Sequence, residues 1–167
     1  LFIRGPYGNG FPMDVLEGSN LVVAAGGSGV APVRPLIRRA MDGRLPVRSL
    51  KVLAGFKSKE GLLFSDELEE CQRCGHATVT IDRPQDGWCG STGLITEHIR
   101  ALELEDPSDV QFVIVGPPVM MKYSVAEALK LQGYAVDVAG DGTEGRWYAK
   151  GNRYDLVILD LMLPGVD

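Results

Sequence analysis

The sequence predicts an α/β fold, with a doubly wound and mostly parallel sheet of five or six strands in a Rossmann-like or flavodoxin-like three-layer sandwich. Two observations lead to this prediction. Short runs rich in Val, Ile and Leu alternate with amphipathic stretches along the 167 residues, and such apolar runs are typical of strands buried on both faces. Strands that alternate with helices favour parallel pairing through right-handed crossovers. The length suits a single domain with a sizeable core.

Each expected element follows from its own run of residues. The expected strands, in chain order, cover residues 21–25, 50–55, 77–81, 110–116, 135–138 and 155–159. The expected helices cover residues 30–41, 63–73, 92–102, 119–131 and 143–150. Residues 5–10 precede them with glycine-rich loop chemistry and no helical period. We expect the sixth strand to lie outside the fifth. A place between the first and the fourth strand is the alternative.

Composition and charge exclude several classes of protein. The net charge of -5 argues against a nucleic-acid binder that neutralises phosphates. No apolar run reaches the roughly 18 residues of a spanning helix, so we expect no membrane partner. Three cysteines are not a disulfide framework, and this usage predicts a cytoplasmic location. The chain begins with Leu1 rather than Met and shows no signal-peptide pattern, so we interpret it as a fragment.

Cys71 and Cys74 form a C-x-x-C pair at the end of an expected helix. This spacing occurs in redox pairs and in half of a zinc site. A thioredoxin-like pair opens a helix instead of ending it, and only His76 and Cys89 lie near enough in sequence to act as further ligands. The pattern therefore favours free thiols, and we expect no metal site.

A glycine-rich turn between a strand and a helix is the strongest local signal. The first strand leads into a helix through Gly26, Gly27, Ser28, Gly29 and Val30. Glycines allow a positive φ and let a ligand approach the backbone, because no Cβ stands in the way. The start of a helix attracts phosphate groups. The turn therefore predicts a diphosphate-binding site, and a tight turn without a ligand is the alternative.

A second turn lies at the end of the fourth expected strand. Gly116, Pro117 and Pro118 stop that strand abruptly at its carboxyl end. Ligands of open α/β sheets bind outside the carboxyl ends of the strands. The two turns together therefore indicate one binding site at one edge of the sheet.

Four motifs carry a resemblance to a known family. They are GPYGNGF at 5–11, GGSGVAP at 26–32, WCGSTGLIT at 88–96 and GPPVMMK at 116–122. In this order they resemble the NAD(P)-binding domain of the ferredoxin–NADP reductase superfamily, of the type found in sulfhydrogenase gamma subunits and in the electron-transfer subunit of dihydroorotate dehydrogenase. The resemblance covers residues 1 to about 124. It implies that the second motif holds the pyrophosphate of NAD(P), and that the fourth lies beside the nicotinamide.

The same resemblance bears on cofactor choice. Arg83 follows the third expected strand, where relatives that prefer NADP often carry a basic residue, and Lys57 and Lys59 follow the second. We therefore favour NADP over NAD. Many relatives carry Cys where this chain has Val115. The family's flavin-binding barrel and iron–sulfur cysteines are not found in this sequence, so we expect weak NADP or NAD binding without a flavin or iron–sulfur site.

The last part of the sequence, residues 125–167, resembles a different family. The stretch EALKLQGYAVDVAGDGTEG, followed by NRYDLVILDLMLPGVD, resembles part of a bacterial response-regulator receiver domain. That resemblance implies that Asp160 is the phosphoacceptor. We expect Asp160 to be inactive, because phosphorylation requires Mg²⁺ and the acidic pair of a receiver is replaced by the turn at 116–118.

These two resemblances lead to three hypotheses. The first is an engineered fold chimera, a single hybrid domain of residues 1–124 and 125–167, with residual dinucleotide binding and no turnover. The second is a natural NAD(P)-binding fragment from the electron-transfer subunit of a flavin-dependent oxidoreductase. The third is a phosphoacceptor signalling module. In each case the apolar run at 155–163 predicts a homodimer through an edge strand or strand swapping.

Overall fold

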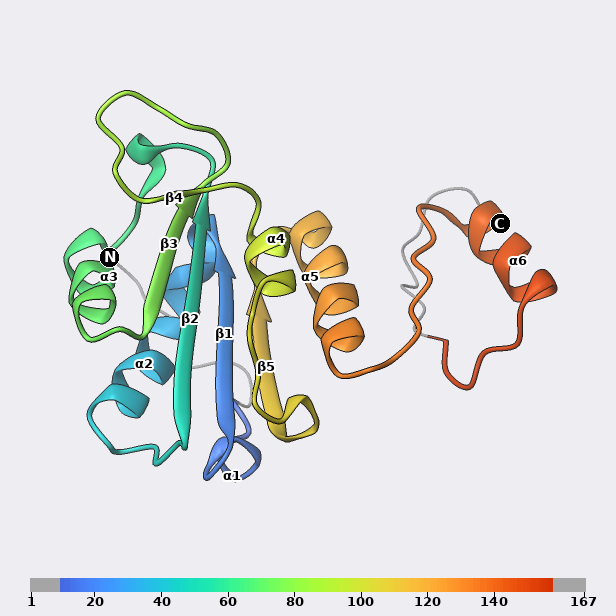
Figure 1. Cartoon of the computed structure of the whole chain (residues 1–167), viewed down its shortest axis with the longest axis horizontal. Helices are drawn as coiled ribbons and strands as arrows, with labels where there is room; N and C mark the ends of the chain where they lie inside the picture. The colour runs from blue at the N-terminus through green and yellow to red at the C-terminus, as the bar shows by residue number, and fades with distance from the viewer. Residues whose placement is uncertain (1–9, 158–167) are drawn as a thin grey trace, which may run out of the picture.

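A computed structural model describes residues 10–157 of the chain. Its centre is a five-stranded sheet in the order β4-β3-β2-β1-β5, with every pair parallel (Figure 1). The strands are β1 (Asn20–Gly26), β2 (Ser49–Phe56), β3 (Ala77–Ile81), β4 (Ser91–Thr92) and β5 (Val110–Val115). The α/β fold class and the first four expected strands are confirmed. The two-residue β4 was not expected, because so short a pairing leaves no pattern in the sequence.

Residues 10–157 contain six α-helices. They are α1 (Met13–Leu16), α2 (Val30–Met41), α3 (Ser65–Arg73), α4 (Ile95–Arg100), α5 (Pro118–Leu131) and α6 (Gly142–Gly151). All five expected helices are found near their expected positions, and α2 has the expected bounds. The four-residue α1 was not expected. No helix within residues 10–157 has the length and apolar character needed to cross a bilayer.

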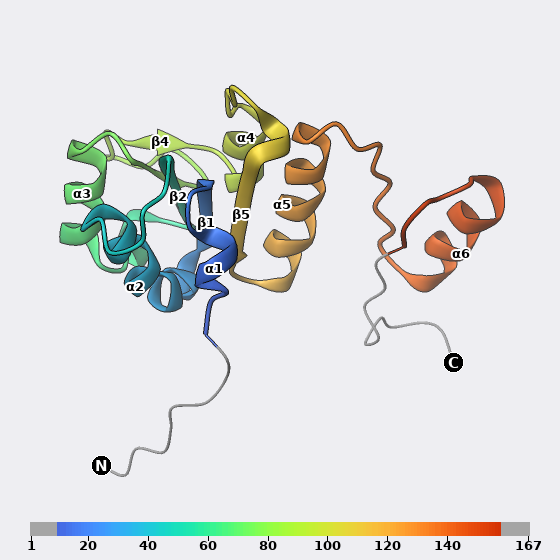
Figure 2. The same ribbon diagram turned by 90° about the horizontal axis from the view of Figure 1, so that it is seen from below.

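The helices pack on both faces of the sheet, which confirms the three-layer sandwich. Helices α2 and α3 cover one face, and α4 and α5 pack on the other. Figure 2 shows α2 and α4 on opposite sides of the strands. Successive residues of a strand point to opposite faces, so Val23 of β1 packs toward α2 while Ala24 packs toward α4. Both residues are 0% exposed, as expected of a central parallel strand.

The prediction of a strand at 135–138 is wrong, since these residues are irregular. Helix α5 ends in a left-handed turn at Gly133, where φ is 88°. There the amide of Tyr134 donates a hydrogen bond of 3.1 Å to the carbonyl of Leu129. Beyond the turn, the Lys122 ammonium of α5 donates to the carbonyl of Ala139. The segment is thus tied to α5 and does not pair with β5.

The expected position of the last strand is also wrong for the residues that the structure describes. Residues 155–157 are irregular, and Leu156 is 77% exposed. The rest of that expected strand, 158 and 159, lies outside the described residues. A place between the first and fourth strands is closed, because β1 pairs directly with β5 from Asn20 opposite Val110 to Ala25 opposite Val115.

Residues 134–157 form an extension beside α5 that we call the C-terminal arm (Figure 1, Figure 2). It contains α6, whose first turn is capped by Asp141. The Asp141 carboxylate accepts hydrogen bonds of 2.9 Å from the amides of Thr143 and Glu144. None of the arm's residues is buried, and Trp147 is 71% exposed. The arm therefore forms local structure without adding to the core. We call residues 10–133 the body.

Candidate functional site

The order of the strands reverses at β1. Along the chain, β2 and β3 are added on one side of β1, and β5 is added on the other side (Figure 1). After β1 the chain continues into α2 on one face, and after β5 it continues into α5 on the other. Connections that diverge in this way leave a crevice outside the carboxyl ends of the strands, and ligands bind there. This crevice is the candidate site.

Three glycines let the two sides of the crevice touch. A Cβ on Gly29 would lie 2.5 Å from the carbonyl oxygen of Val115. A Cβ on Gly116 would lie 3.2 Å from the amide nitrogen of Gly26 and 2.4 Å from the sulfur of Met120. A Cβ on Gly26 would lie 2.5 Å from the same sulfur. A side chain at any of these positions would force its neighbours apart, so these glycines are required for packing.

Gly27 has a different role from the other glycines. Its φ is 54°, in the left-handed region, and a Cβ placed there would meet nothing within 4 Å. The backbone at Gly27 therefore faces open space, and Ser28 beside it is exposed. No side chain caps the first turn of α2, and the partial positive charge at a helix N-terminus attracts anions. This geometry fits a diphosphate group.

The other side of the crevice is the turn between β5 and α5. Pro117 is extended, with φ -57° and ψ 145°, and α5 begins at Pro118. Both prolines are exposed. A proline in the first turn of a helix loses no hydrogen bond, so this sequence ends the strand and starts the helix within three residues. The sequence analysis missed Met120, whose sulfur packs against Gly26 and Gly116; its place in the GPPVMMK motif was the available signal.

Arg83 does not line the crevice. It is exposed directly after β3, and β2 lies between β3 and β1. The loop that carries it is bonded to the loop after β2. The amide of Lys59 donates a hydrogen bond of 2.7 Å to the Gln85 side-chain oxygen. The ammonium of Lys59 donates to the carbonyl of Asp86. Arg83 therefore lies on the same carboxyl edge of the sheet, two strands away from β1.

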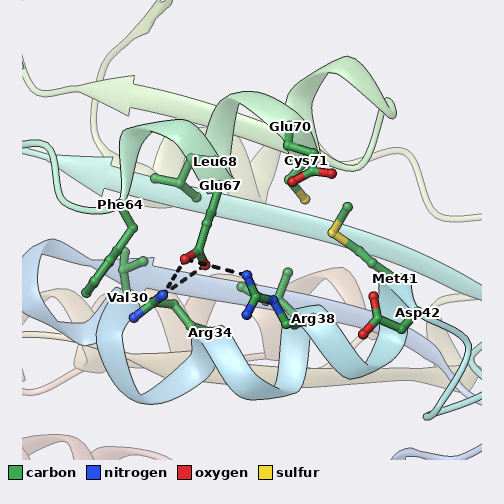
Figure 3. A pocket seen from close by; sticks show the side chains of 11 residues that line it. Val30, Arg34, Arg38, Met41, Asp42, Phe64, Glu67, Leu68, Glu70 and Cys71 are labelled. Carbon is green, nitrogen blue, oxygen red and sulfur yellow. Dashed lines mark hydrogen bonds and ion pairs between the residues drawn. The ribbon is translucent and has the colours of Figure 1, made fainter.

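A groove of about 210 Å³ lies between α2 and α3 (Figure 3). The Arg34 guanidinium forms two hydrogen bonds with the Glu67 carboxylate, one of them 3.0 Å long, and lies 3.8 Å from the centre of the Phe64 ring. The hydrogen bond from Arg34 holds the pKa of Glu67 below its ordinary value. The residues that line the groove do not include the crevice glycines. We interpret the groove as a contact between helices and not as the site.

The three cysteines are free thiols, as expected. Cys71 is buried, which raises the pKa of its thiol to about 11, whereas Cys74 and Cys89 are exposed. Among residues 10–157, no group of three or more His, Cys, Asp or Glu side chains is placed to hold a metal ion. The C-x-x-C pair is therefore divided between the core and the surface at the end of α3.

The structure brings together most, but not all, of the residues expected at the site. Gly26, Gly29 and Gly116 are in contact, and Gly27 lies next to them. Arg83 lies apart. Asp160 and residues 5–9 of the first motif fall outside the described residues.

The comparison with protein families matches a known domain. Residues 23–126 match the model of the oxidoreductase NAD-binding domain. The gamma subunit of sulfhydrogenase 2 from Pyrococcus furiosus is 38% identical over 141 residues, which cover 76% of this chain and 48% of that protein. The gamma subunit of sulfhydrogenase 1 from the same organism is 36% identical over 141 residues, covering 80% of this chain and 47% of that protein. The chain thus spans about half the length of these relatives.

Solved structures show the same fold. Amycolatopsis cytochrome P450 reductase GcoB has a TM-score of 0.62 at 19% identity, covering 78% of this chain and 40% of that one. The cytochrome b5 reductase domain of Ulva prolifera nitrate reductase has a TM-score of 0.58 at 22% identity, covering 70% of this chain and 45% of that one.

These matches support the resemblance to the ferredoxin reductase superfamily, but not the engineered chimera or the receiver-like part. The natural alternative is the hypothesis that they favour. Helix α5 crosses the expected junction near residue 124 without a break, as all three hypotheses allow. Beyond that junction, Glu127 accepts hydrogen bonds of 2.9 and 3.1 Å from Arg100, which precedes it. Since the family match covers more than half of its residues, the chain belongs to the family of oxidoreductase NAD-binding domains.

Proposed function

We propose that this chain is the dinucleotide-binding part of an electron-transfer subunit of a flavin-dependent oxidoreductase. It binds NADP or NAD in the crevice between the ends of β1 and β5. The observation that carries the proposal is the backbone of Gly27, which has φ 54° and faces open space. Gly27 lies where the strand order reverses, in a member of the NAD-binding family. The similarity to sulfhydrogenase gamma subunits supports the electron-transfer role.

Each side of the crevice has its own task in this proposal. The diphosphate lies against Gly27 and Ser28 at the start of α2, where backbone amides, the serine hydroxyl and the helix dipole favour negative charge. The nicotinamide lies beside Pro117 and Pro118, which hold the backbone after β5 in a fixed conformation. Gly29, in contact with β5, keeps the two sides close together.

The chemistry of the bound cofactor is hydride transfer, and the nicotinamide ring supplies or accepts that hydride. The residues of this chain bind the diphosphate and orient the ring. In a flavin-dependent oxidoreductase the other partner in this transfer is a flavin, which must lie next to the nicotinamide. We therefore expect this chain alone to bind the dinucleotide weakly and not to turn it over.

Substitution of Gly27 tests the proposal, with Gly43 as a matched control. Both glycines have a positive φ, 54° and 71°, and a Cβ on either would meet nothing within 4 Å. Gly43 follows α2 at its far end. Gly27→Leu fills the space assigned to the diphosphate, whereas Gly43→Leu causes similar backbone strain away from the crevice. By calorimetry, we expect Gly27→Leu to weaken binding at least about tenfold and Gly43→Leu to leave it unchanged.

Two results would contradict the proposal. One is the absence of binding heat for the unchanged chain with NADH and NADPH at about 1 mM, which marks the weak end of specific binding. The other is equal weakening by both substitutions. Melting temperatures of the two variants show whether either fails to fold.

We also propose that Arg83 favours NADP by binding the 2′-phosphate. Arg83 is exposed on the carboxyl edge of the sheet, and a guanidinium can form two charge-assisted hydrogen bonds with a phosphate. Loss of one such bond costs about 1.5–3 kcal/mol, a factor of roughly 10 to 150 in affinity, and an exposed position lies at the lower end of that range. We expect Arg83→Ser to weaken NADPH binding by about tenfold while NADH binding stays the same. Lys57→Ser, which also removes an exposed charge from this edge, is the control.

A further inference from the structure

The loops that follow β2 and β3 are joined beyond the carboxyl ends of these strands (Figure 1). The first loop spans residues 57–64 and the second spans residues 82–90. The side-chain oxygen of Gln85 accepts a hydrogen bond of 2.7 Å from the amide of Lys59. The carbonyl of Asp86 accepts a second bond from the Lys59 ammonium. We call these two hydrogen bonds the loop tie.

Arg83 lies between two anchors of the second loop. One residue before it, the amide of Asp82 donates a hydrogen bond of 2.9 Å to the carbonyl of Phe56 at the end of β2. Two residues after it, Gln85 takes part in the loop tie. Pro84 lies between them, and a proline disfavours the helical conformation for the residue that precedes it. The backbone that carries the Arg83 guanidinium is therefore held on both sides.

The far end of this loop is also fixed. The Trp88 ring nitrogen donates a hydrogen bond of 2.8 Å to the carbonyl of Ser91, where β4 begins. The Trp88 ring packs against the core and leaves no room for a Cβ on Gly90. The loop tie thus holds the middle of a loop whose two ends are already attached to the sheet. Loss of the tie should loosen the middle of the loop without unfolding its ends.

The cationic side chains of the two loops differ in their contacts. They are Lys57 and Lys59 in the first loop and Arg83 in the second. The Lys59 ammonium is bonded to the carbonyl of Asp86. Lys57 and Arg83 are exposed, and neither side chain forms a hydrogen bond or ion pair with another residue in the range 10–157. The charge of Lys59 therefore holds the second loop in place, whereas Arg83 keeps its donors available for a ligand.

We propose that Lys59 and Gln85 are positioning residues for the choice of cofactor, because the loop tie holds Arg83 where it can bind the 2′-phosphate of NADP. This inference rests on the role proposed above for Arg83. A loop that is held in its binding conformation loses less entropy when the ligand arrives. If the loop adopts that conformation only part of the time, the affinity falls by the same fraction. NADH has no 2′-phosphate, so the tie should affect the binding of NADPH alone.

A substitution that leaves the charge unchanged gives the first test. Gln85→Met keeps the length of the side chain and removes the oxygen that accepts the Lys59 amide. Gln72→Met makes the same change at an exposed position of α3 and is the control. By calorimetry, we expect Gln85→Met to weaken NADPH binding about fivefold and to leave NADH binding unchanged. Unchanged NADPH binding, or equal weakening of both cofactors, would overturn the proposal.

The two lysines of the first loop provide a second, matched pair. Lys59→Met and Lys57→Met each remove one positive charge from the same loop, but only Lys59→Met also removes a bond of the loop tie. We expect Lys59→Met to weaken NADPH binding about fivefold and Lys57→Met to have no comparable effect. Equal losses in the two variants would show that Lys59 acts through its charge alone and would contradict its positioning role.

A double substitution separates this inference from the function on which it rests. In a chain that already carries Arg83→Ser, Gln85→Met should change NADPH binding by less than about twofold, because no guanidinium is left to position. A full fivefold loss in that background would overturn the positioning role. If Arg83→Ser by itself leaves NADPH binding unchanged, both proposals fail. If Arg83→Ser weakens NADPH binding and Gln85→Met does not, only the positioning role fails.

Hydrogen exchange tests the loop tie without any cofactor. The Lys59 amide is bonded to the Gln85 side chain, and the Asp82 amide is bonded to the Phe56 carbonyl. Local opening of a hydrogen bond sets the exchange rate of its amide. We expect Gln85→Met to speed the exchange of the Lys59 amide at least about fivefold and to leave that of the Asp82 amide unchanged. Equal rates for the Lys59 amide in the two chains would show that the tie is not formed in solution and would overturn the proposal.

Discussion

The body and the C-terminal arm contain similar sequence patterns but end in different structural states. In the body, the apolar run of β1 lies between two strands and two layers of helices, and Leu21 is 0% exposed. In the arm, the run that begins at Leu156 is equally apolar in sequence, yet Leu156 is 77% exposed. The difference lies in the available partners, because a parallel strand becomes stable only when neighbouring strands and helices cover it. An apolar run in the sequence therefore shows that a segment can form a buried strand. Whether it does so depends on the strands and helices available to cover it.

Truncation of one leucine in each region should give the largest contrast. Leu36 in α2 is 0% exposed, so Leu36→Ala removes buried contacts and leaves a cavity, at a cost of about 2–5 kcal/mol in the free energy of unfolding. Leu156→Ala should change that free energy by less than about 0.5 kcal/mol in the monomer. Urea unfolding at a concentration too low for association measures both. Similar costs for the two variants would mean that the arm belongs to the cooperative core.

A glycine in each region gives the next contrast. Gly29→Ala places a Cβ 2.5 Å from the carbonyl oxygen of Val115, and we expect this overpacking to destabilise the body by about 1–3 kcal/mol. Gly151 ends α6, and a Cβ there would meet nothing within 4 Å. Gly151→Ala should therefore be neutral or slightly stabilising. Thermal unfolding of the two variants provides the comparison, and a tolerated Gly29→Ala would contradict the close contact between the two sides of the crevice.

Removal of a hydroxyl group in each region should give a smaller contrast. Here the variant in the body is expected to be more stable than the unchanged chain. Ser124 of α5 is 0% exposed, and its hydroxyl has no hydrogen-bond partner among residues 10–157. A buried polar group without a partner is destabilising, so Ser124→Ala should raise the free energy of unfolding by about 1 kcal/mol. Thr143 of α6 is exposed, and Thr143→Ala should have no comparable effect. A loss of stability in Ser124→Ala would show that the hydroxyl does have a partner in solution.

The pH dependence of stability separates two glutamates. The hydrogen bond from Arg100 lowers the pKa of Glu127 below its ordinary value of 4.5. A carboxyl whose pKa is lower in the folded state stabilises the fold above its unfolded pKa, and this stabilisation is lost as the pH falls through the folded value. We therefore expect Glu127→Gln to melt a few degrees below the unchanged chain at pH 7, with the gap closing below about pH 4.

The control for this experiment lies in the arm. Glu144 of α6 is exposed, and Glu144→Gln should leave the unfolding of the body unchanged at either pH. A melting gap for Glu127→Gln that persists unchanged from pH 7 to well below pH 4 would rule out a role for the charge of Glu127 in its bond with Arg100.

Helices and strands could be predicted from the sequence where the local pattern and the packing agree. The bounds of α2 were predicted because the glycine-rich turn that follows β1 ends at Gly29, and the amphipathic stretch that begins at Val30 continues to Met41. A strand at 135–138 was predicted on similar grounds, and this prediction is wrong. The conformation of the segment depends on the hydrogen bond from Lys122 and on the turn at Gly133. Neither of these could be inferred from a short apolar pattern.

The site was predicted in part for the same reason. The diphosphate turn at 26–30 is continuous in sequence, so its residues could be named together. The position of Arg83 relative to the crevice depends on the order of the strands, and a single loop does not encode that order. Met120 was missed because the GPPVMMK motif that contains it does not by itself show that the sulfur packs against Gly26 and Gly116.

The position of Met120 has a consequence for the sensitivity of the protein to oxidation. Oxidants convert methionine to its sulfoxide, which is bulkier and polar. On the side of Met120 that faces Gly26 and Gly116, an added oxygen would enter a space too small for a Cβ on either glycine. Oxidative damage to this single thioether would therefore distort the crevice while the rest of the core remained intact. Repair by a methionine sulfoxide reductase would reverse the damage.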